Sequence, residues 1–397
     1  NVKAIVYSSA IKANNPEILE GKRISIPLVS RAEMLAELMR NKKSIAIAGS
    51  HGKTTTTSII GNILDQANFD PTIVNGGIIN SYSKNNRFGK GDWMIVEADE
   101  SDGSFLRLPH QINIITNIDL EHLDYYKTKK NLLLAFEKFI LNLPFYGYSV
   151  ICIENKNLKK IFKKIKTRKI ITYSKTYKSD VLITNIKKSK ISSEFSLFFK
   201  KGIIENITGR FNFKTTLLGE HNILNATAAI ITSLIADVPI KNISKSLNTF
   251  QGVKRRFSFL GNINKSSIYD DYAHHPSEIK ASYEIAKQIS EKKIIVIFQP
   301  HRFSRTKLLF NDFIKALKKI DILFILDIYP AGEKSIKEIN SKKLVNKLLN
   351  KKRKVNYLSK KVDLKSVLKQ YFDDENTIIF MGAGSISNIA HKIFKNL

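Results

Sequence analysis

Cysteine is nearly absent from this chain of 397 residues, where Cys152 is the only one. A single thiol excludes an intrachain disulfide and fits a protein of the reducing cytoplasm. Runs of 18 or more apolar residues are also absent, so the sequence predicts no membrane-spanning helix. No charged-then-apolar leader is present, and we expect no signal peptide. Because the first residue is Asn1 and not a methionine, we expect the chain to begin inside a longer natural sequence.

Acidic residues are scarce relative to basic ones, with 35 Asp and Glu against 65 Lys and Arg and a formal net charge of +30. Such an excess occurs in proteins that bind nucleic acids, so a basic nucleic-acid-binding NTPase is one hypothesis. The lysines, however, are spread along the whole chain among abundant Ile and Asn, which indicates compositional drift. No zinc-ligand spacing, homeodomain or RNP pattern occurs. We therefore expect no nucleic-acid partner.

Continuous apolar runs predict buried parallel strands in two parts of the chain. The runs of the first part are 44–48, 93–97 and 112–116, and those of the second part are 268–271, 294–298, 322–327 and 377–381. Between them, residues 165–218 alternate polar and apolar side chains, which favours an added antiparallel sheet. The length and the hydrophobic content of 43% are enough for two or three domains of α/β class.

The strand at 44–48 leads into a glycine turn and then a helix, which is the arrangement of a polyphosphate site. The turn reads Gly49-Ser50-His51-Gly52-Lys53-Thr54. Backbone N–H groups at the helix start can face an anion, Lys53 can neutralise phosphate oxygens, and the Thr54 hydroxyl can bind Mg²⁺. Two residues separate the glycines, whereas the ordinary P-loop has four. We therefore expect ATP and Mg²⁺ at a loop of unusual length; the alternative is a chance Gly-Lys-Thr.

Acidic segments follow two of the expected strands. Residues 97–102 read Glu-Ala-Asp-Glu-Ser-Asp, and Asn117-Ile118-Asp119 precedes His122. Ligands gather at the carboxyl ends of parallel strands, where a carboxylate can hold Mg²⁺. We expect the strand before His122 to neighbour the strand that ends at Glu97. The alternatives are a solvated acidic loop and an ordinary core or surface histidine.

Four segments farther along the chain also carry polar residues at strand or helix ends. They are Gly219-Glu220-His221-Asn222-Ile223-Leu224-Asn225-Ala226, Lys254-Arg255-Arg256-Phe257, Asp270-Asp271-Tyr272-Ala273-His274-His275-Pro276 and Pro300-His301-Arg302-Phe303-Ser304-Arg305. In the last segment two arginines stand three residues apart, which predicts a pair on one helical face that grips a carboxylate. Gly382-Ala383-Gly384 is interpreted as a structural turn between a strand and a helix.

These motifs, in this order, resemble the Mur ligase family, whose members add amino acids to the nucleotide precursor of peptidoglycan. The resemblance covers essentially the whole chain, beginning at Ser8-Ser9-Ala10 and Arg31-Ala32-Glu33-Met34-Leu35, and points to the alanine-adding branch. It implies an ATP-dependent ligase that joins L-alanine to UDP-N-acetylmuramate through an acyl phosphate, with small-molecule partners only. A tripeptide-adding ligase of the same family and a folylpolyglutamate-type ligase are the enzymatic alternatives.

The resemblance also implies roles for individual residues. The expected catalytic residues are Lys53, Glu97, His122 and Arg256, the last reaching the γ-phosphate with Arg255 in reserve, and the metal ligands are Thr54, Glu97 and His122. The expected ATP-binding residues are Gly49, Ser50, His51, Gly52, Lys53, Thr54, Thr55, Asn222, Arg256 and Asp271. The expected substrate-binding residues are His51, Tyr272, His274, His301, Arg302 and Arg305. Some relatives carry a carbamylated lysine where this chain has Phe136, so none is expected here.

Three domains follow from the resemblance. Residues 1–41 correspond to the end of an N-terminal domain that binds the UDP-sugar, residues 42–254 to a parallel-sheet, P-loop-like ATP-binding domain with the added antiparallel sheet, and residues 255–397 to a Rossmann-like amino-acid-binding domain. Because only about 40 residues correspond to the first domain, we expect weaker binding of the sugar nucleotide than of ATP.

Overall fold

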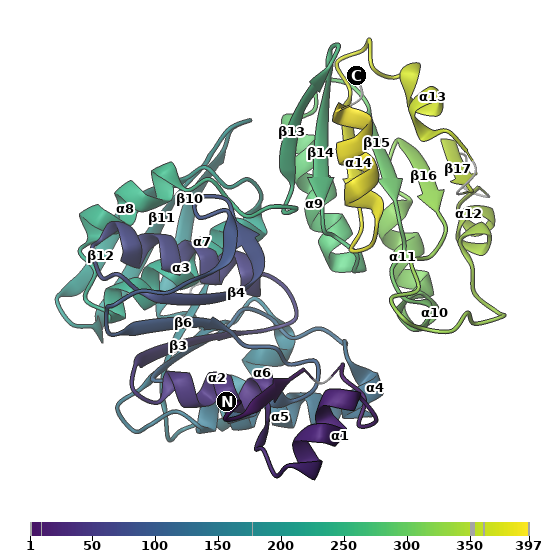
Figure 1. The fold of residues 1–397 in the computed structure, drawn as a ribbon. Helices are drawn as coiled ribbons and strands as arrows, with labels where there is room; N and C mark the ends of the chain where they lie inside the picture. The colour runs from purple at the N-terminus through teal and green to yellow at the C-terminus, as the bar shows by residue number, and fades with distance from the viewer. Residues whose placement is uncertain (1, 9, 177, 350–353, 360–361, 396–397) are drawn as a thin grey trace. The chain divides into compact units, whose positions relative to one another are not determined.

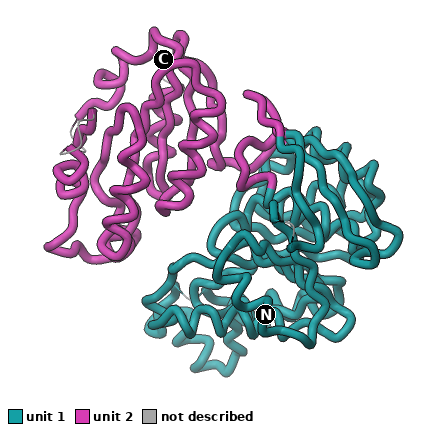
Figure 2. The backbone as a smooth tube through the Cα atoms, turned by 180° about the vertical axis from the view of Figure 1, so that it is seen from behind, with its two compact units in different colours: residues 1–186, 194–215, 224–250 teal, residues 187–193, 216–223, 251–397 magenta. Residues whose placement is uncertain are grey.

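The computed structural model describes residues 2–8, 10–176, 178–349, 354–359 and 362–395. The chain divides into two compact units, shown in different colours in Figure 2. Unit 1 contains residues 1–186, 194–215 and 224–250, and unit 2 contains residues 187–193, 216–223 and 251–397. Within the described ranges, no helix is both long and apolar enough to cross a membrane. Each unit is built on a largely parallel sheet, so the expected α/β class is confirmed.

The chain begins in unit 1 with a small two-stranded layer. Strands β1 (Ile5–Tyr7) and β2 (Leu28–Ser30) pair in parallel, and α1 (Pro16–Arg23) connects them. Helix α2 (Arg31–Met39) follows. Its first turn is fixed by a capping box, in which Ser30 Oγ accepts from Glu33 N while the Glu33 carboxylate accepts from Ser30 N.

Ten strands form the main sheet of unit 1, in the order β12-β11-β10-β9-β8-β7-β3-β6-β4-β5. Their bounds are β3 Lys43–Ala48, β4 Thr72–Ile79, β5 Lys84–Arg87, β6 Trp93–Glu97, β7 Ile112–Ile115, β8 Tyr148–Cys152, β9 Lys169–Ser174, β10 Val181–Lys188, β11 Ser193–Ile204 and β12 Ile207–Thr215. The seven neighbouring strands β10, β9, β8, β7, β3, β6 and β4 are parallel, and β5 is antiparallel to β4. The alternating residues 165–218 therefore extend this sheet at one edge, and there β9 and β10 are parallel.

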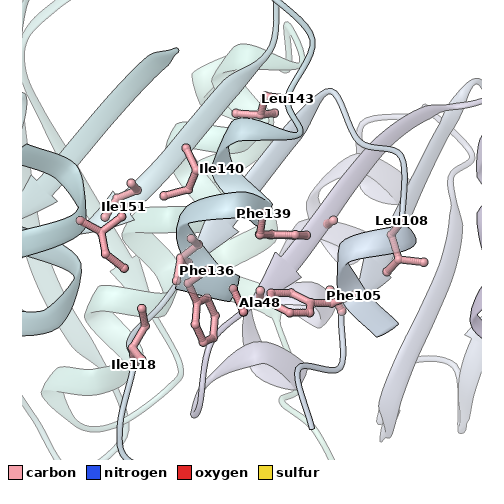
Figure 3. Close-up of a cluster of buried hydrophobic side chains, with 14 of the residues drawn as sticks. Ala48, Phe105, Leu108, Ile118, Phe136, Phe139, Ile140, Leu143 and Ile151 are labelled. Atoms are coloured by element: carbon pink, nitrogen blue, oxygen red, sulfur yellow. The ribbon is translucent and has the colours of Figure 1, made fainter. Parts of the chain in front are cut away.

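Helices cover both faces of the sheet, as Figure 1 shows. On one face lie α3 (Lys53–Gln66), α7 (Glu220–Ile235) and α8 (Ile240–Thr249), and on the other lie α2, α5 (Lys129–Leu141) and α6 (Lys156–Lys164). The second face carries a core in which Phe136 and Phe139 of α5 meet Phe105 of the short helix η1 (Ser104–Arg107) (Figure 3). The Phe105 and Phe139 rings stack with centroids 4.9 Å apart. Burial on both faces explains why the central strands read as continuous apolar runs.

Unit 2 is a second three-layer structure. Its sheet has the order β13-β14-β18-β15-β16-β17, in which only β13 is antiparallel to its neighbour among the described strands. Helices α9 (Pro276–Ile289), α11 (Phe310–Leu317) and α12 (Ser341–Leu349) cover one face, and α13 (Leu364–Lys369) and α14 (Ile386–Lys395) the other. The strands are β13 Ser258–Ile263, β14 Ser266–Asp271, β15 Ile294–Phe298, β16 Ile322–Leu326, β17 Lys354–Leu358 and β18 Thr377–Met381. Four of these strands match the runs expected from the sequence.

The aromatic core of unit 1 predicts a stability difference between two positions of α5. The substitution Phe139→Ala removes a fully buried ring and leaves a cavity in the core. We therefore expect a loss of about 3–5 kcal/mol in the free energy of unfolding. Trp93 is the only tryptophan of the chain and lies in unit 1, so its fluorescence during denaturant unfolding reports on this unit. Leu134→Ala, on the same helix but 42% exposed, is the matched control and should shift stability by less than about 0.5 kcal/mol. Equal effects of the two substitutions would contradict the placement of this core.

Candidate active site

The glycine loop of unit 1 lies at the carboxyl end of β3, in the middle of the sheet. Strand β3 pairs with β6 on one side and with β7 on the other, and both pairs are parallel. The segments that follow all three strands therefore meet at one edge. We expected the strand before His122 to neighbour the strand that ends at Glu97; this was wrong, because the phosphate-loop strand lies between them. The correction places the loop between the two acidic segments.

Both glycines of the loop have backbone conformations that other residues rarely adopt. Gly49 has φ of +130°, and a Cβ there would collide with the Thr116 side chain. Gly52 has φ of +84° at the N-terminus of α3, and a Cβ there would lie 2.5 Å from Asn225 Oδ1. Left-handed backbone and close approach both require glycine. The geometry of this turn therefore requires glycine at both positions.

The segment after β7 holds the loop in place through hydrogen bonds. Asn117 Oδ1 accepts from His51 N at 2.9 Å, and Asn117 Nδ2 donates to His51 O at 2.9 Å. Ser50 N donates to Asn117 O, and Thr116 Oγ1 donates to His51 O at 2.6 Å. The His51 ring contacts Asp119, with Nε2 and Oδ2 3.1 Å apart. These contacts preform the loop, and they show that Asn117 and Thr116, which sequence reasoning did not select, support it.

Lys53 is the first residue of α3, and its ammonium is enclosed by acceptors. Nζ donates to Gly49 O at 2.6 Å and lies 2.7 Å from Glu100 Oε2, on a carboxylate that is buried. Burial by itself lowers the pKa of Lys53, but the carboxylates of Glu100, Glu97 and Asp99 outweigh it and raise the pKa above its ordinary value. The lysine is therefore charged. Glu100 was not among the selected residues, although it stands three positions after Glu97 in the acidic segment.

Glu97 ends β6, as expected from the sequence, and contacts Thr54. Thr54 Oγ1 donates to Glu97 Oε1 at 3.1 Å, and Glu97 Oε2 accepts from Gly76 N at 2.7 Å. A hydroxyl and a carboxylate in contact beside a phosphate loop are oxygen donors of the kind that Mg²⁺ prefers. The residues present therefore fit this cation, and the structure brings two of the three expected metal ligands together.

The third expected ligand, His122, lies with a different set of carboxylates. Its backbone is left-handed, with φ of +56°, and its Nε2 lies 3.7 Å from Glu100 Oε1. One ligand atom each from Glu100, Glu121 and His122 lies within 4.8 Å of the others, a spacing that suits a metal ion. Glu121 was not selected from the sequence, since the residue directly before a histidine gives no signal without the fold.

Asn222, which we expected to bind ATP, lies in the first turn of α7. Asn222 Nδ2 donates to Leu218 O at 2.8 Å, so this amide group already caps its own turn. Asn225, one turn later, is the residue that approaches Gly52. Thr55 is buried in the first turn of α3. The structure therefore places Asn225 and Thr55 at the phosphate loop.

In unit 2, Asp271 ends β14 and Tyr272 follows it, with Arg255 and Arg256 next to the tyrosine ring. The guanidinium carbons of Arg255 and Arg256 lie 4.8 and 5.1 Å from the centre of the Tyr272 ring. Arg255 Nη2 donates to Gly382 O at 2.9 Å, whereas Arg256 Nη1 lies 3.8 Å from Glu278 Oε1. Arg255 is thus bound to the glycine turn that we interpreted as structural. The two adjacent arginines therefore have different neighbours.

Asp271 is buried, and its carboxylate accepts hydrogen bonds from Ser282 Oγ and from Ala273 N. Burial raises its pKa to about 6, although the Ser282 hydroxyl and the Arg256 charge oppose this shift. A carboxyl group with this pKa changes charge just below neutral pH.

The expected substrate residues of unit 2 form one cluster of rings and charges. The His274 ring lies 5.1 Å from the Tyr272 ring and 5.7 Å from the His301 ring. Arg305 Nη1 lies 3.3 Å from His301 Nδ1. Burial, together with the nearby His274 and arginine charges, lowers the pKa of His301 to about 4, so its imidazole is neutral at pH 7. The structure brings together residues that are 33 positions apart in the sequence, from 272 to 305.

Arg302 differs from its expected placement. We expected Arg302 and Arg305 on one face of a helix, but α10 runs from Phe303 to Leu308 and Arg302 precedes it with φ of +69°. Its Nε donates to Glu333 Oε1 at 2.6 Å. The backbone turns at this residue, so its side chain direction is set by a contact with a distant loop and not by helical spacing.

The fold and the site define a class of protein: an α/β protein with a nucleotide-phosphate loop at the carboxyl edge of a parallel sheet. Three family descriptions match the chain, namely the Mur ligase family catalytic domain over residues 1–43, the Mur ligase middle domain over 47–233 and the Mur ligase glutamate ligase domain over 255–384. The chain belongs to the Mur ligase family. The resemblance inferred from the motifs is confirmed.

Individual relatives carry more specific names. The UDP-N-acetylmuramate–L-alanine ligase of Rickettsia felis is 46% identical over 402 residues, covering 99% of this chain and 84% of the relative. The ligase of the same name from Rickettsia prowazekii is 46% identical over 406 residues, covering 100% and 81%. Among solved structures, the UDP-N-acetylmuramate–alanine ligase of Thermotoga maritima is similar with a TM-score of 0.82 and 26% identity, covering 99% of this chain and 85% of that one.

A more distant neighbour shares the fold. The MurF ligase of Thermotoga maritima, solved in complex with ADP, has a TM-score of 0.72 at 15% identity and covers 99% of this chain and 95% of that one.

The tight approach at Gly52 predicts the effect of a single methyl group on nucleotide binding. In Gly52→Ala, backbone strain and the collision with Asn225 should distort the loop, so we expect ADP affinity, measured by calorimetry, to fall at least about tenfold. Gly202→Ala is the matched control, because φ is +80° there but nothing lies within 4 Å of the added carbon. It carries a similar backbone strain and should leave ADP affinity unchanged. Equal affinities of the two variants for ADP would contradict the assigned geometry.

The raised pKa of Asp271 predicts a titration just below neutral pH. Because the folded state binds the proton more tightly than the unfolded state, stability should fall as pH rises from about 4 to about 6 and then level off, by roughly 3 kcal/mol in total. Carboxyl ¹³C NMR of selectively labelled aspartate, with Asp271→Asn used to assign the signal, should give a midpoint near 6. A midpoint at or below 4 would show that the carboxyl is not desolvated.

Proposed function

We propose that this chain joins L-alanine to the carboxylate of UDP-N-acetylmuramate at the expense of ATP. The observation that carries the reaction type is the charged Lys53 at the start of α3, which lies in the short phosphate loop next to the buried Glu100. The choice of sugar nucleotide and amino acid rests on the names of relatives that are 46% identical over nearly the whole chain. The expected substrate-binding residues of unit 2 lie together in one cluster, which supports the same choice.

The chemistry explains why ATP is needed. A carboxylate is a poor acyl donor, because an oxide ion would have to leave. Its oxygen therefore attacks the γ-phosphorus of ATP, forming an acyl phosphate while ADP leaves. The neutral amine of alanine then attacks the acyl carbon, and the resulting tetrahedral intermediate expels inorganic phosphate and loses a proton to give the amide. Catalysis of the first step is mainly positioning and charge neutralisation.

The loop residues perform that neutralisation in our proposal. Backbone N–H groups from Gly52 to Thr55 and the Lys53 ammonium bind the phosphate oxygens, and Arg256 supplies a second positive charge. Thr54 and Glu97 would hold Mg²⁺, and His122, with Glu100 and Glu121 beside it, would hold a second metal ion. Such ions would supply positive charge that offsets the charge of the phosphate oxygens. Glu100 holds Lys53 in place before nucleotide binds. Ser50, His51 and Gly52 complete the loop, while Asn222 and Asp271 contact the nucleotide.

The amino-acid side of the reaction belongs to unit 2. Tyr272, His274, His301, Arg302 and Arg305 bind the amino acid and the product end of the sugar nucleotide, with His51 contributing from the loop. A neutral His301 is suited to accept or donate a hydrogen bond without attracting the carboxylate away from the arginines. Arg302 and Arg305 provide the two planar cations that bind carboxylates best.

We assign residues 1–41 to a sugar-nucleotide domain, residues 42–254 to the ATP-binding domain and residues 255–397 to the amino-acid-binding domain. The proposed site of action is the cytoplasm, where ATP and the sugar nucleotide are made. The partners are the small-molecule substrates, without nucleic acid. The dispersed lysines support this last point, since they mark no groove or recognition module.

Phosphate release in an amino-acid panel tests the proposal. With ATP, Mg²⁺ and UDP-N-acetylmuramate, we expect alanine to give a higher kcat/KM than glycine, serine or the tripeptide L-Ala-γ-D-Glu-meso-diaminopimelate. Lys53→Met should lower kcat by at least about 10²-fold, because the phosphate charge loses its main partner. Phosphate release that needs no sugar nucleotide, or that DNA stimulates, would contradict the ligase assignment. A higher kcat/KM with the tripeptide would instead favour the tripeptide-adding branch.

A further inference from the structure

A carboxylate outside the expected site, Glu333, is bound to one of the expected arginines. Glu333 follows β16 in a loop whose residues Ala331 and Gly332 have φ of +48° and +84°. Glu333 Oε1 accepts from Arg302 Nε at 2.6 Å and from Ser304 Oγ at 2.5 Å, and Glu333 Oε2 accepts from Ser304 N at 3.0 Å. Both carboxylate oxygens therefore accept hydrogen bonds from Arg302 and Ser304, at the start of α10.

The backbone of Arg302 is fixed by the same loop. Arg302 N donates to Tyr329 O at 2.8 Å, and the neighbouring His301 forms a parallel bridge with Tyr329. The rings of His301 and Tyr329 stack with centroids 5.6 Å apart and an interplanar angle of 10°. On the other side, Arg302 O accepts from Thr306 Oγ1 at 2.8 Å. A left-handed arginine persists only where the surroundings hold it, and this loop does so.

An arginine side chain is long, and it loses considerable rotamer freedom when it binds a ligand. A carboxylate on Nε fixes the plane of the guanidinium, and this plane determines where its terminal N–H groups point. The side chains of Arg302 and Glu333 are only 30% and 19% exposed, so water screens their attraction weakly. Burial tends to raise the pKa of Glu333, but the Ser304 hydrogen bonds and the Arg302 charge lower it below its ordinary value. The carboxylate is thus ionised throughout the physiological range.

We propose that Glu333 is a positioning residue that holds Arg302 in the orientation that binds the carboxylate of the amino-acid substrate. This inference rests on the proposed function, because it assumes that Arg302 meets that carboxylate. It explains why Arg302 is built on a turn and not on the helix: the turn directs Nε toward the loop of Glu333. Arg305 has a different support, its contact with His301.

A purely structural role is the competing explanation, since Glu333 also accepts hydrogen bonds from Ser304 at the start of α10. Loss of that contact would destabilise the helix start and impair all substrates alike. Loss of positioning instead weakens one substrate only. The Michaelis constants for alanine and for ATP, measured on the same variant, therefore separate the two roles.

The experiment compares Glu333→Gln with the wild-type chain in the phosphate-release assay. Glutamine has the same size and keeps an acceptor but loses the charge, so we expect the KM for alanine to rise about tenfold. The kcat and the KM for ATP should stay within about twofold of the wild-type values. The thermal unfolding midpoint should equal that of the wild-type chain within experimental error. Glu333→Asp, which keeps the charge, should recover part of the alanine affinity.

Glu338→Gln is the matched control. Glu338 Oε2 accepts from Lys307 Nζ of α10 at 2.6 Å, so it makes an ion pair of the same length as that of Glu333, but between two exposed side chains. This variant should leave both Michaelis constants unchanged. If it raises the KM for alanine as much as Glu333→Gln does, loss of any negative charge near α10 weakens alanine binding, and the proposal is overturned.

Arg302→Lys separates failure of the inference from failure of the proposed function. If Arg302→Lys raises the KM for alanine and Glu333→Gln does not, alanine binding by Arg302 stands and positioning by Glu333 is wrong. Parallel increases in the KM for alanine and for ATP, with a lower unfolding midpoint, show a structural role and also overturn the proposal. If the wild-type chain releases no phosphate with any amino acid, the proposed function itself fails, and the role of Glu333 fails with it.

Discussion

The ammonium of Lys53 is the constraint on which the architecture of unit 1 depends. A buried cation is costly unless carboxylates surround it, and here Glu100 supplies the contact while Glu97 and Asp99 add to the field. This arrangement requires β6 directly beside β3, so that the acidic segment and the loop share one edge of the sheet. It also requires β7 on the other side, where Asn117 fixes the loop backbone. The sheet order is thus the means by which a charge is held ready for phosphate.

Unit 2 uses charge in a comparable way, with each arginine given a separate support. Arg255 is held by the carbonyls of Gly382 and Gly384, and its Nε lies 4.0 Å from the buried carboxylate of Asp270. Arg256 shares the Tyr272 ring with it but faces Glu278. Two adjacent arginines therefore have different surroundings. The glycine turn between the last strand and the last helix supplies the carbonyl acceptors for one of them, Arg255.

Much of the fold was readable from the sequence because its strands are buried on both faces. Apolar runs identified β3, β6, β7, β15 and β18, and the glycine loop identified the start of α3. Sequence reasoning could not order the strands, since parallel runs carry no sign of their neighbours, and it therefore placed the β7 strand beside β6. The alternating residues after 165 predicted strands but not that they extend the same sheet.

The candidate site was predicted only where a motif lies within one segment. Glu100 and Glu333 were not selected because their importance comes from contacts with residues 47 and 31 positions away, namely Lys53 and Arg302. The helical spacing of Arg302 and Arg305 also misled, because the left-handed backbone of Arg302 was not visible in the sequence. Short motifs thus identify which residues do chemistry, while the groups that hold them come from distant parts of the chain.

The most direct test of the central charge pair is a double-mutant cycle on unit 1. The free energies of unfolding of the wild-type chain, Lys53→Met, Glu100→Gln and the double variant would be measured through Trp93 fluorescence. If the buried pair organises the loop, each single variant leaves an uncompensated buried group, and the double variant should be more stable than the sum of the single losses predicts, by at least about 2 kcal/mol. Additive losses within about 0.5 kcal/mol would contradict the account, because they would show that the two side chains do not depend on each other.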